Sequence, residues 1–365
     1  MKISFITNWN DFCGLYIHAK LLFLAFKEID KKIKIKVYSP IEYFEEKTRI
    51  FLKKNERFVF PSYSFIRFGD QLNDQQLATL NNFLYLDKKI FSEESDLAII
   101  EKPTSLPLQK FYYYTQTFKN KIKKLVAIVH EGKPIINDYF YKIDWDKIFI
   151  FDERYKSIFL KKVNPKKITI FPFPCFTFNQ KTTKKNKKIE KILIIIKIPF
   201  NNFLILDSLI KDLKKKFTVN ILYSRSNKIS QKKSFINLIN LNQFFLKEKI
   251  SFFLLRNDPF EKRFLNFLKN YDLIIFLEDP NQPIEYIPVS SFASLILNLR
   301  IPIICPNNAF FYPFASGEVI KYKNFHHLHK LLINIENYLP NEEKINHYLK
   351  KNSNVKLAKK LLQLI

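Results

Sequence analysis

His130 and Glu131 are the residues of this 365-residue chain whose types and position best suit chemistry. They follow the apolar run Leu125–Val129 and precede Gly132, so they come where a buried strand passes into a loop. A polar pair at the carboxyl end of such a strand faces the edge at which α/β sheets bind ligands, and histidine titrates near neutral pH. We predict that both residues are catalytic; the alternative is a core histidine that satisfies a backbone carbonyl.

Two more glycines stand at strand and loop junctions, in a chain that has only four. Gly14 follows the run Lys2–Thr7 and opens a helical stretch, and Gly317 comes after the run Ile301–Cys305. A chain so poor in glycine should keep it where a Cβ is not tolerated, at positive φ or against a ligand. We predict that Gly14 and Gly317 contact a ligand; for Gly14 the alternative is a plain helix-start turn.

Five residues of the second half are candidates for contact with an anion. Ser290 and Ser291 are expected to start a helix, where hydroxyls, free N–H groups and the positive end of the helix dipole suit a phosphate. The alternative is a plain N-cap, a common role of serine. Lys197, Arg225 and Arg256 each follow a predicted strand. Their alternative is solvated surface charge, above all for Lys197 in a lysine-rich chain.

Metal chemistry is not indicated by the remaining candidate ligands. Three histidines stand at the start of a predicted helix: His326, His327 and His329. Their spacing does not converge three imidazoles on one ion, so a solvated helix is expected. The three cysteines are far apart and lack metal-type spacing: Cys13, Cys175 and Cys305. Reduced thiols in a cytoplasmic protein are the simplest interpretation.

The elements that must position these residues alternate short apolar runs with helical stretches. The apolar runs are continuous, which is typical of strands buried on both faces of a parallel sheet. We predict an α/β fold with an N-terminal domain over 1–175, a lysine-rich linker over 176–191 and a second domain over 192–340. A helical tail follows over 341–365, with its leucines on one face. Two such domains should turn their strand ends toward a shared cleft, where ligands bind.

The composition is that of a strongly basic, packed protein. The formal charge of +27 comes mainly from lysine, in a mixture typical of codon bias in an AT-rich genome. A field of that sign would nevertheless attract nucleic acid, acidic lipid or sugar nucleotides. The N-terminus shows no secretion signal, and no apolar run approaches the roughly 20 residues that span a bilayer. We expect a cytoplasmic protein, and any contact with a membrane would be peripheral.

Four stretches in order make the chain similar to a known family. They are the strand and glycine loop Met1–Gly14 with the helix start Tyr16–Lys20, then Val129–Gly132, Ile168–Cys175 and Val289–Ile304. In this order they resemble a glycosyltransferase of the GT-B fold, nearest to the retaining glycosyltransferase family 4. The resemblance covers most of the chain as an order of elements, with short and degenerate motifs.

The resemblance implies two Rossmann-like domains facing a central cleft, with a C-terminal helix that crosses back to the first domain. It implies a hexosyltransferase of the EC 2.4 class. Such an enzyme would move a sugar from a nucleoside-diphosphate sugar to a glycan, lipid-linked or protein acceptor, with retention and without a metal or other cofactor. A histidine at the position of His130 would lie near the donor sugar, and basic side chains such as those of Lys197, Arg225 and Arg256 would neutralise the leaving diphosphate. Glu318 would contact donor hydroxyls; its alternative is a solvated loop carboxylate.

The sequence also departs from the family's pattern. Relatives often have two glutamates eight residues apart at the donor site, whereas the second position falls near Leu295 here and Glu285 is not at the matching first position. Lys197–Asn201 replaces a glycine loop. One alternative is therefore a non-catalytic sugar- or nucleotide-binding protein on the same scaffold. The charge suggests another, a DNA-modifying glucosyltransferase or nucleic-acid-binding protein, although nucleic acid is the less favoured partner.

Overall fold

A computed structural model describes most of the chain. The described residues are 1–9, 14–41, 58–66, 72–81, 83–130, 132–159, 162–175, 188–197, 203–224, 251–254, 262–278 and 289–365. The chain divides into two compact units. The first comprises Met1–Phe176, Ile284–Ser291 and Lys351–Ile365, and the second comprises Thr177–Pro283 and Phe292–Lys350.

The first unit is built on a seven-stranded parallel sheet of order β3-β2-β1-β4-β5-β6-β7. Its strands are β1 (Lys2–Ile6), β2 (Lys34–Pro40), β3 (Val59–Tyr63), β4 (Leu97–Glu101), β5 (Leu125–Ile128), β6 (Lys147–Ile150) and β7 (Ile168–Ile170). Every residue of β4 and β5 is buried, including Glu101 at the end of β4. Continuous apolar runs form these strands because helices cover both faces of the sheet.

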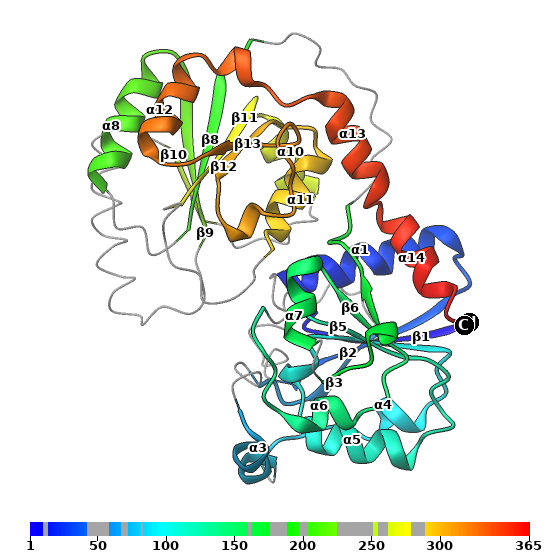
Figure 1. Cartoon of the computed structure of the whole chain (residues 1–365). Coiled ribbons are helices and arrows are strands. Elements are labelled where there is room, and N and C mark those ends of the chain that lie inside the picture. Colours follow the sequence, from blue (N-terminus) through cyan, green and yellow to red (C-terminus); the bar gives the residue numbers. More distant parts are fainter. Residues whose placement is uncertain are drawn as a thin grey trace. The chain divides into compact units, whose positions relative to one another are not determined.

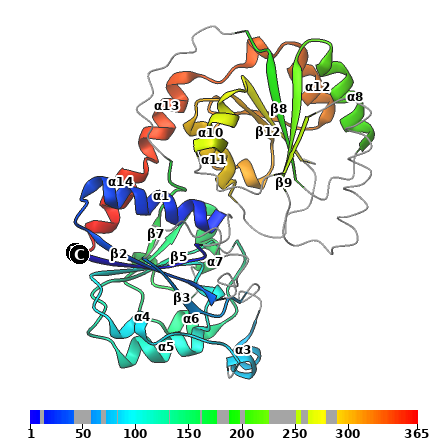
Figure 2. The same ribbon diagram turned by 180° about the vertical axis from the view of Figure 1, so that it is seen from behind.

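Helices form a layer on each side of that sheet. They are α1 (Gly14–Ile29), α3 (Asp74–Asn81), α4 (Lys89–Ser92), α5 (Leu108–Thr117), α6 (Asp138–Lys142), α7 (Lys156–Phe159) and α14 (Asn354–Leu362), with 3-10 turns at Pro103–Ser105, Glu153–Tyr155 and Pro165–Lys167. Figures 1 and 2 show α1 and α14 on one face of the sheet and α4 and α5 on the other. The sheet is therefore the middle of three layers, with its apolar residues enclosed.

The C-terminal helix α14 packs on α1, as the sequence predicts (Figure 1). Leu357 and Leu361 are buried in it, and the Asn354 side chain donates a hydrogen bond of 3.1 Å to the Leu21 carbonyl. The tail forms two helices, because the chain between them forms backbone hydrogen bonds with Cys175 instead of continuing as a helix. Ser353 then caps α14 by accepting a hydrogen bond from the Lys356 backbone N–H.

The second unit has a six-stranded parallel sheet of order β10-β9-β8-β11-β12-β13. Its strands are β8 (Lys191–Lys197), β9 (Thr218–Ser224), β10 (Ser251–Leu254), β11 (Leu273–Leu277), β12 (Ile303–Pro306) and β13 (Ile320–Tyr322). Its helices are α8 (Phe203–Lys214), α10 (Lys262–Lys269), α11 (Ser291–Asn298), α12 (Phe325–Ile333) and α13 (Glu342–Lys351), with 3-10 turns at Ala309–Phe311 and Ile335–Tyr338. Figures 1 and 2 show α8 and α12 on one face and α10 and α11 on the other.

The two parallel α/β units confirm the predicted fold class. The isoleucine run of β8 illustrates the reason, because every residue of Ile192–Ile196 is buried while β9 and β11 flank the strand. Of the predicted linker 176–191, residues 176–187 lie outside the described part of the chain. In that described part, no helix combines the length and the apolar character that crossing a membrane requires.

Candidate functional site

The parallel register of the first sheet brings three polar residues from distant parts of the sequence together. Glu101 is the last residue of β4 and pairs with Ile128, the last residue of β5. His130 follows two positions later, so it also lies at the carboxyl edge of the sheet. The third residue, His18, is on α1, and its side chain is completely buried.

One carboxylate binds both imidazoles. His18 Nδ1 lies 2.8 Å from Glu101 Oε1, and His130 Nε2 lies 3.0 Å from Glu101 Oε2. The side chains of His18 and Glu101 are 0% exposed, whereas that of His130 is 11% exposed. We call these three residues the buried triad. Its carboxylate is shielded from water, and only His130 reaches the surface.

Aromatic rings enclose the buried triad. The His18 ring centroid lies 5.2 Å from that of Phe173 and 5.6 Å from that of Phe151. Phe151 also meets the His130 ring edge-on, with the centroids 4.8 Å apart. Polar groups in so apolar a setting must satisfy one another, because an unpaired buried group is costly. Within the buried triad, the buried Nε2 of His18 has no hydrogen-bond partner among the described residues.

Burial and pairing act in opposite directions on the charges of the buried triad. Burial alone would raise the pKa of Glu101, but the charge of His18 and the hydrogen bonds from His130 and His18 outweigh it, so this pKa is lowered. Burial lowers the pKa of His130 to about 4 against the attraction of Glu101, and repulsion from His18 and Lys102 contributes. At neutral pH the site therefore holds a carboxylate and a neutral His130 imidazole.

The buried triad is also the one group of side chains among the described residues that could converge on a metal ion, since its three ligand atoms lie within 4.8 Å of one another. Zinc would need two nitrogens and an oxygen roughly 2 Å from one centre. The two contacts are instead hydrogen bonds to different oxygens of the carboxylate. Hydrogen bonding accounts for the geometry, so the residues do not fit a metal site as they stand.

The three histidines of the predicted helix start have separate surroundings, as their spacing indicates. His327 Nδ1 accepts a hydrogen bond of 3.2 Å from the Lys323 backbone N–H. His329 Nε2 lies 3.0 Å from Asp212 Oδ2 on α8. His326 belongs to the same helix, α12. The observed contact of His327 is thus within its own helix start, and that of His329 is with the neighbouring helix α8.

The predicted glycines differ in backbone conformation. Among the described glycines, a positive φ occurs at Gly317, where φ is 100°. A Cβ built there would lie 2.6 Å from Lys344 Cδ, so the position favours glycine for two reasons. Gly14 begins α1 without a positive φ, and Gly132 also lacks one. The conformational reason for keeping glycine therefore holds for Gly317 alone among these three. The contact of Gly14 with a ligand stays a prediction.

Glu318 closes the turn that contains Gly317. Its Oε2 accepts a hydrogen bond of 2.8 Å from the Ala315 backbone N–H. The turn leads directly into β13, whose first residue, Ile320, pairs with Ile304 of β12. Glu318 therefore lies at the amino end of β13. Lys197, by contrast, lies at the carboxyl end of β8, at the opposite edge of the same parallel sheet. Its contact with a donor stays a prediction, and its observed contact is structural.

Lys197 and the two serines follow strands of the second sheet along the chain, although Ser290 and Ser291 themselves belong to the first unit. Lys197 ends β8, and its backbone pairs with Ser224, the last residue of β9. Ser291 begins α11, which follows β11 along the chain, and Ser290 comes just before it. The parallel topology places these chain positions at one edge of the second sheet. Three candidates lie outside the described residues: Glu131, Arg225 and Arg256.

The sequence matches no protein-family model. Solved structures nevertheless match the fold over the whole chain. HepE of Anabaena in complex with UDP has a TM-score of 0.64 at 10% identity, covering 100% of this chain and 99% of HepE. The lipopolysaccharide outer core galactosyltransferase WaaB has a TM-score of 0.59 at 12% identity, with coverage of 100% and 99%.

The same fold also occurs in a protein of Listeria monocytogenes that is named for UDP-N-acetylglucosamine 2-epimerase activity. Its TM-score is 0.57 at 11% identity, covering 99% of this chain and 94% of that protein. At such identities the likeness is one of fold. The chain thus has the GT-B fold, which proteins named for different reactions of sugar nucleotides share.

Proposed function

We propose that this protein is a glycosyltransferase that moves a sugar from a nucleoside-diphosphate sugar to an acceptor. The observation that carries the proposal is the full-length match to HepE, which has been solved with UDP and with UDP-glucose. The buried triad supports it, because ligands of open α/β sheets bind at the carboxyl ends of the strands. A neutral imidazole that reaches the surface at that edge is suited to contact a sugar hydroxyl.

In this proposal the first unit takes the acceptor and the second takes the donor. Lys197, Arg225 and Arg256 stabilise the charge that develops on the leaving diphosphate, so the donor needs no metal ion. The N-terminus of α11, with Ser290 and Ser291, is the expected contact for a phosphate. We further propose a retaining reaction, in which the leaving phosphate itself assists the incoming hydroxyl. Catalysis then rests on positioning and on charge stabilisation.

Two alternatives use the same fold and the same class of ligand. An epimerase would change the sugar of the nucleotide without transferring it to an acceptor. This alternative is considered because the Listeria protein of similar fold is named as an epimerase. A non-catalytic protein would bind a sugar nucleotide and leave it intact. Leu295, at a position where related enzymes often have glutamate, is the feature that favours the second alternative.

A thermal-shift screen followed by product analysis separates these three functions. The full chain is first heated with UDP-, GDP- and ADP-sugars, since a ligand that binds the native state raises the melting temperature. Mass spectrometry then follows the sugar that binds, with glycan, peptide and lipid-linked acceptors added. We expect the free nucleotide and a glycosylated acceptor. An altered sugar still attached to the nucleotide would indicate an epimerase, and unchanged ligand would indicate a binding protein.

We also propose that the acceptor is lipid-linked and that the first unit meets an anionic membrane on the cytoplasmic side. The support is an aromatic face with large exposed side chains, namely Phe83, Tyr85, Tyr113 and Ile136, of which Phe83 is 85% exposed. Lysines lie over rings in the same region, since Lys142 Nζ is 4.7 Å from the Tyr139 ring and Lys162 Nζ is 4.7 Å from the Tyr141 ring. Aromatic rings with lysines suit the headgroup region of an anionic bilayer.

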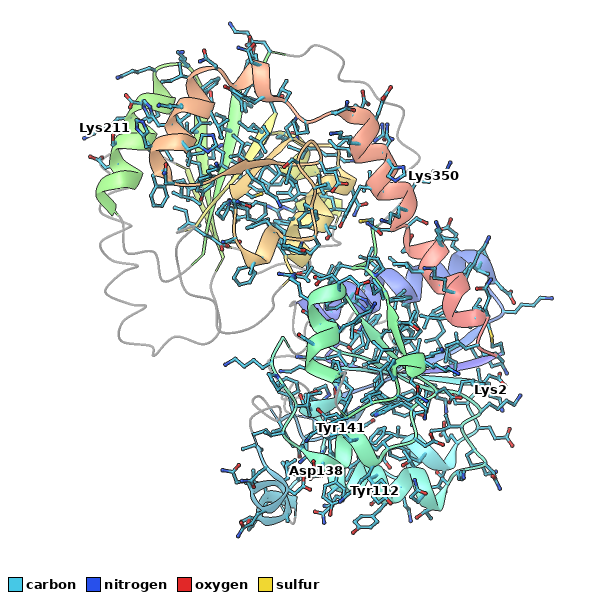
Figure 3. All side chains as sticks on the ribbon, viewed as in Figure 1. Lys2, Tyr112, Asp138, Tyr141, Lys211 and Lys350 are labelled. Atoms are coloured by element: carbon cyan, nitrogen blue, oxygen red, sulfur yellow. The ribbon has the colours of Figure 1, made fainter. Side chains whose placement is uncertain are left out.

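Contacts join α5 to two other segments of this region. Tyr113 of α5 and Tyr139 of α6 have ring centroids 6.4 Å apart. Lys110 of α5 donates a hydrogen bond of 2.7 Å to the Leu84 carbonyl, between Phe83 and Tyr85. Figure 3 shows Tyr112, Asp138 and Tyr141 over α5 and α6, at the end of the first unit away from α1 and α14. This end of the unit is therefore the surface we assign to the membrane.

Vesicle sedimentation tests this assignment. We expect the full chain to sediment with vesicles that contain phosphatidylglycerol and to bind those of pure phosphatidylcholine less. The double variant F83A/Y113A should lose most of this binding, whereas Tyr338→Ala, which removes an exposed ring of the second unit, should keep it. Equal loss in both variants would contradict the assignment. A salt-dependent shift of DNA without vesicle binding would favour a nucleic-acid partner.

A further inference from the structure

We propose that Glu101 is a positioning residue that keeps the ring proton of His130 on Nε2, so that His130 Nδ1 presents a lone pair to a ligand hydroxyl. Nothing in the sequence pattern singled out Glu101 or His18. The part of this inference that concerns the ligand rests on the proposed function. The part that concerns the proton rests on the geometry of the buried triad alone.

The charge of the Glu101 carboxylate fixes the direction of its two hydrogen bonds. An ionised carboxylate has no proton to donate, so each of its oxygens can only accept. Glu101 Oε1 meets His18 Nδ1 at 2.8 Å and Oε2 meets His130 Nε2 at 3.0 Å, so both ring nitrogens must carry protons. A neutral imidazole carries one ring proton. With that proton on Nε2, Nδ1 of His130 is left as an acceptor.

His18 holds the Glu101 carboxylate in place. Its hydrogen bond occupies the carboxylate oxygen that His130 does not use, so the carboxylate is held at both ends. Its ring is completely buried and contacts the His130 ring with centroids 5.2 Å apart. Its own Nε2 is buried without a hydrogen-bond partner among the described residues, so the ring is held through Nδ1. His18 thus holds Glu101, and Glu101 holds His130.

The backbone next to Glu101 has an uncommon conformation. The next residue, Lys102, has a φ of 52° and a ψ of 67°, a left-handed conformation that is uncommon for a residue other than glycine. The Lys102 N–H donates to the Ile128 carbonyl at 3.0 Å, and the Ser105 hydroxyl donates to the Lys102 carbonyl at 2.7 Å. The strand end is therefore fixed in a strained turn, and such strain concentrates at functional sites.

A ligand has access to only one member of the buried triad. Among the three side chains, only that of His130 keeps exposed surface, 11% against 0% for the other two. A ligand at the carboxyl edge of the first sheet can therefore reach His130, while Glu101 and His18 act through it. A carboxylate that orients an imidazole in this way sets which ring nitrogen faces the substrate.

The experiment that tests the proton position is NMR of the full chain with 15N-labelled histidine. We expect two ring N–H groups that exchange slowly with water, one on His18 Nδ1 and one on His130 Nε2. They are assigned by their absence from His18→Gln and His130→Gln, respectively. In Glu101→Gln only one should remain, because an amide offers a single acceptor oxygen. A His130 proton on Nδ1 in the wild type would overturn the inference, and so would a stoichiometric metal ion found by elemental analysis.

Kinetics test the role toward the ligand, once a donor has been identified. We expect Glu101→Gln to lower kcat about a hundredfold with little change in KM for the donor, since transfer then loses an oriented imidazole. Glu101→Asp should recover part of that loss. The matched control is Asp152→Asn. Asp152 follows β6, and its carboxylate pairs with Arg154 at 2.7 Å.

The two kinds of measurement separate the inference from the proposed function. Full activity of a folded Glu101→Gln, or an equal loss in Asp152→Asn, would overturn the positioning role. Absence of transfer by the wild type with every donor would instead count against the proposed function, while the NMR result would still decide where the proton lies.

Discussion

Glu101 and Glu318 are two loop-edge glutamates with opposite surroundings. Glu101 ends β4, is completely buried and binds two histidines from distant parts of the sequence. Glu318 precedes β13 and accepts a hydrogen bond from Ala315, three residues away in its own turn. The comparison shows that the partners supplied by sheet topology decide what a carboxylate can do. A glutamate bound to its own turn shapes a loop, whereas one enclosed with imidazoles can orient them.

The largest expected effect is that of removing the buried carboxylate. Glu101→Ala should destabilise the first unit by about 3–5 kcal/mol, because the buried His18 and the largely enclosed His130 lose their common partner. Trp9 and Trp145 are the only tryptophans of the chain, and both are buried in the first unit, so urea unfolding followed by their fluorescence reports on that unit. A decrease of less than about 1 kcal/mol in the free energy of unfolding would mean that Glu101 contributes no more than an exposed carboxylate does.

The second effect is a dependence of the stability of the first unit on pH. The pKa of His130 falls from 6.5 to about 4 in the folded state, which corresponds to on the order of 3 kcal/mol. The unfolded chain therefore binds the extra proton first as the pH falls. Stability is fully present above pH 6.5 and is lost between about pH 6.5 and 4. The lowered pKa of Glu101 acts in the same direction.

The check on this dependence is urea unfolding repeated at several pH values by tryptophan fluorescence. His130→Gln should flatten the curve over that range, because glutamine does not titrate. His329→Gln, at a half-exposed pair with Asp212, is the matched control and should leave it unchanged. Equal slopes in wild type and His130→Gln would show that other groups cause the acid loss.

The third effect concerns the turn of the second unit. Gly317→Ala should cost about 1–2 kcal/mol, because alanine at this positive φ is strained, and its Cβ must also displace the Lys344 side chain. Hydrogen exchange of the β13 amides is the measurement, since the tryptophans do not report on this unit. Gly132→Ala, at a glycine without positive φ, is the control. Unchanged exchange in Gly317→Ala would mean that the turn adapts easily.

The smallest effect is that of Glu318→Ala, the counterpart of the first substitution. It removes the hydrogen bond to the Ala315 backbone, so we expect a loss of about 0.5–1.5 kcal/mol in the same exchange measurement. The contrast with Glu101→Ala is the quantity of interest. Comparable losses at the two glutamates would remove the distinction on which the comparison rests.

Much of the fold could be predicted because burial on both faces leaves a continuous apolar run. Ile192–Ile196 and Leu125–Val129 both became strands or strand ends of parallel sheets. The leucine spacing of the tail likewise predicted a helix with a buried face, and Leu357 and Leu361 are buried against the first unit. These signals are local, so they can be read before any contact between distant segments is known.

The buried triad was harder to predict, because its members are far apart in sequence. His130 stood out beside a glycine after an apolar run. Glu101 also follows such a run, but a charged residue there ordinarily marks the end of a strand. His18 lies within an amphipathic helix and gives no signal of its own. Only the parallel register of β4 with β5 and the position of α1 bring the three together.

The measurement that tests the proposed function most directly is an NMR time course of the anomeric proton of the bound sugar nucleotide, with an acceptor present. The account predicts that the donor signal decays while a new glycosidic signal of the same anomeric configuration grows, more slowly in Glu101→Gln than in the wild type. A donor signal that persists in the presence of tight binding, or a new sugar still linked to the nucleotide, would contradict it.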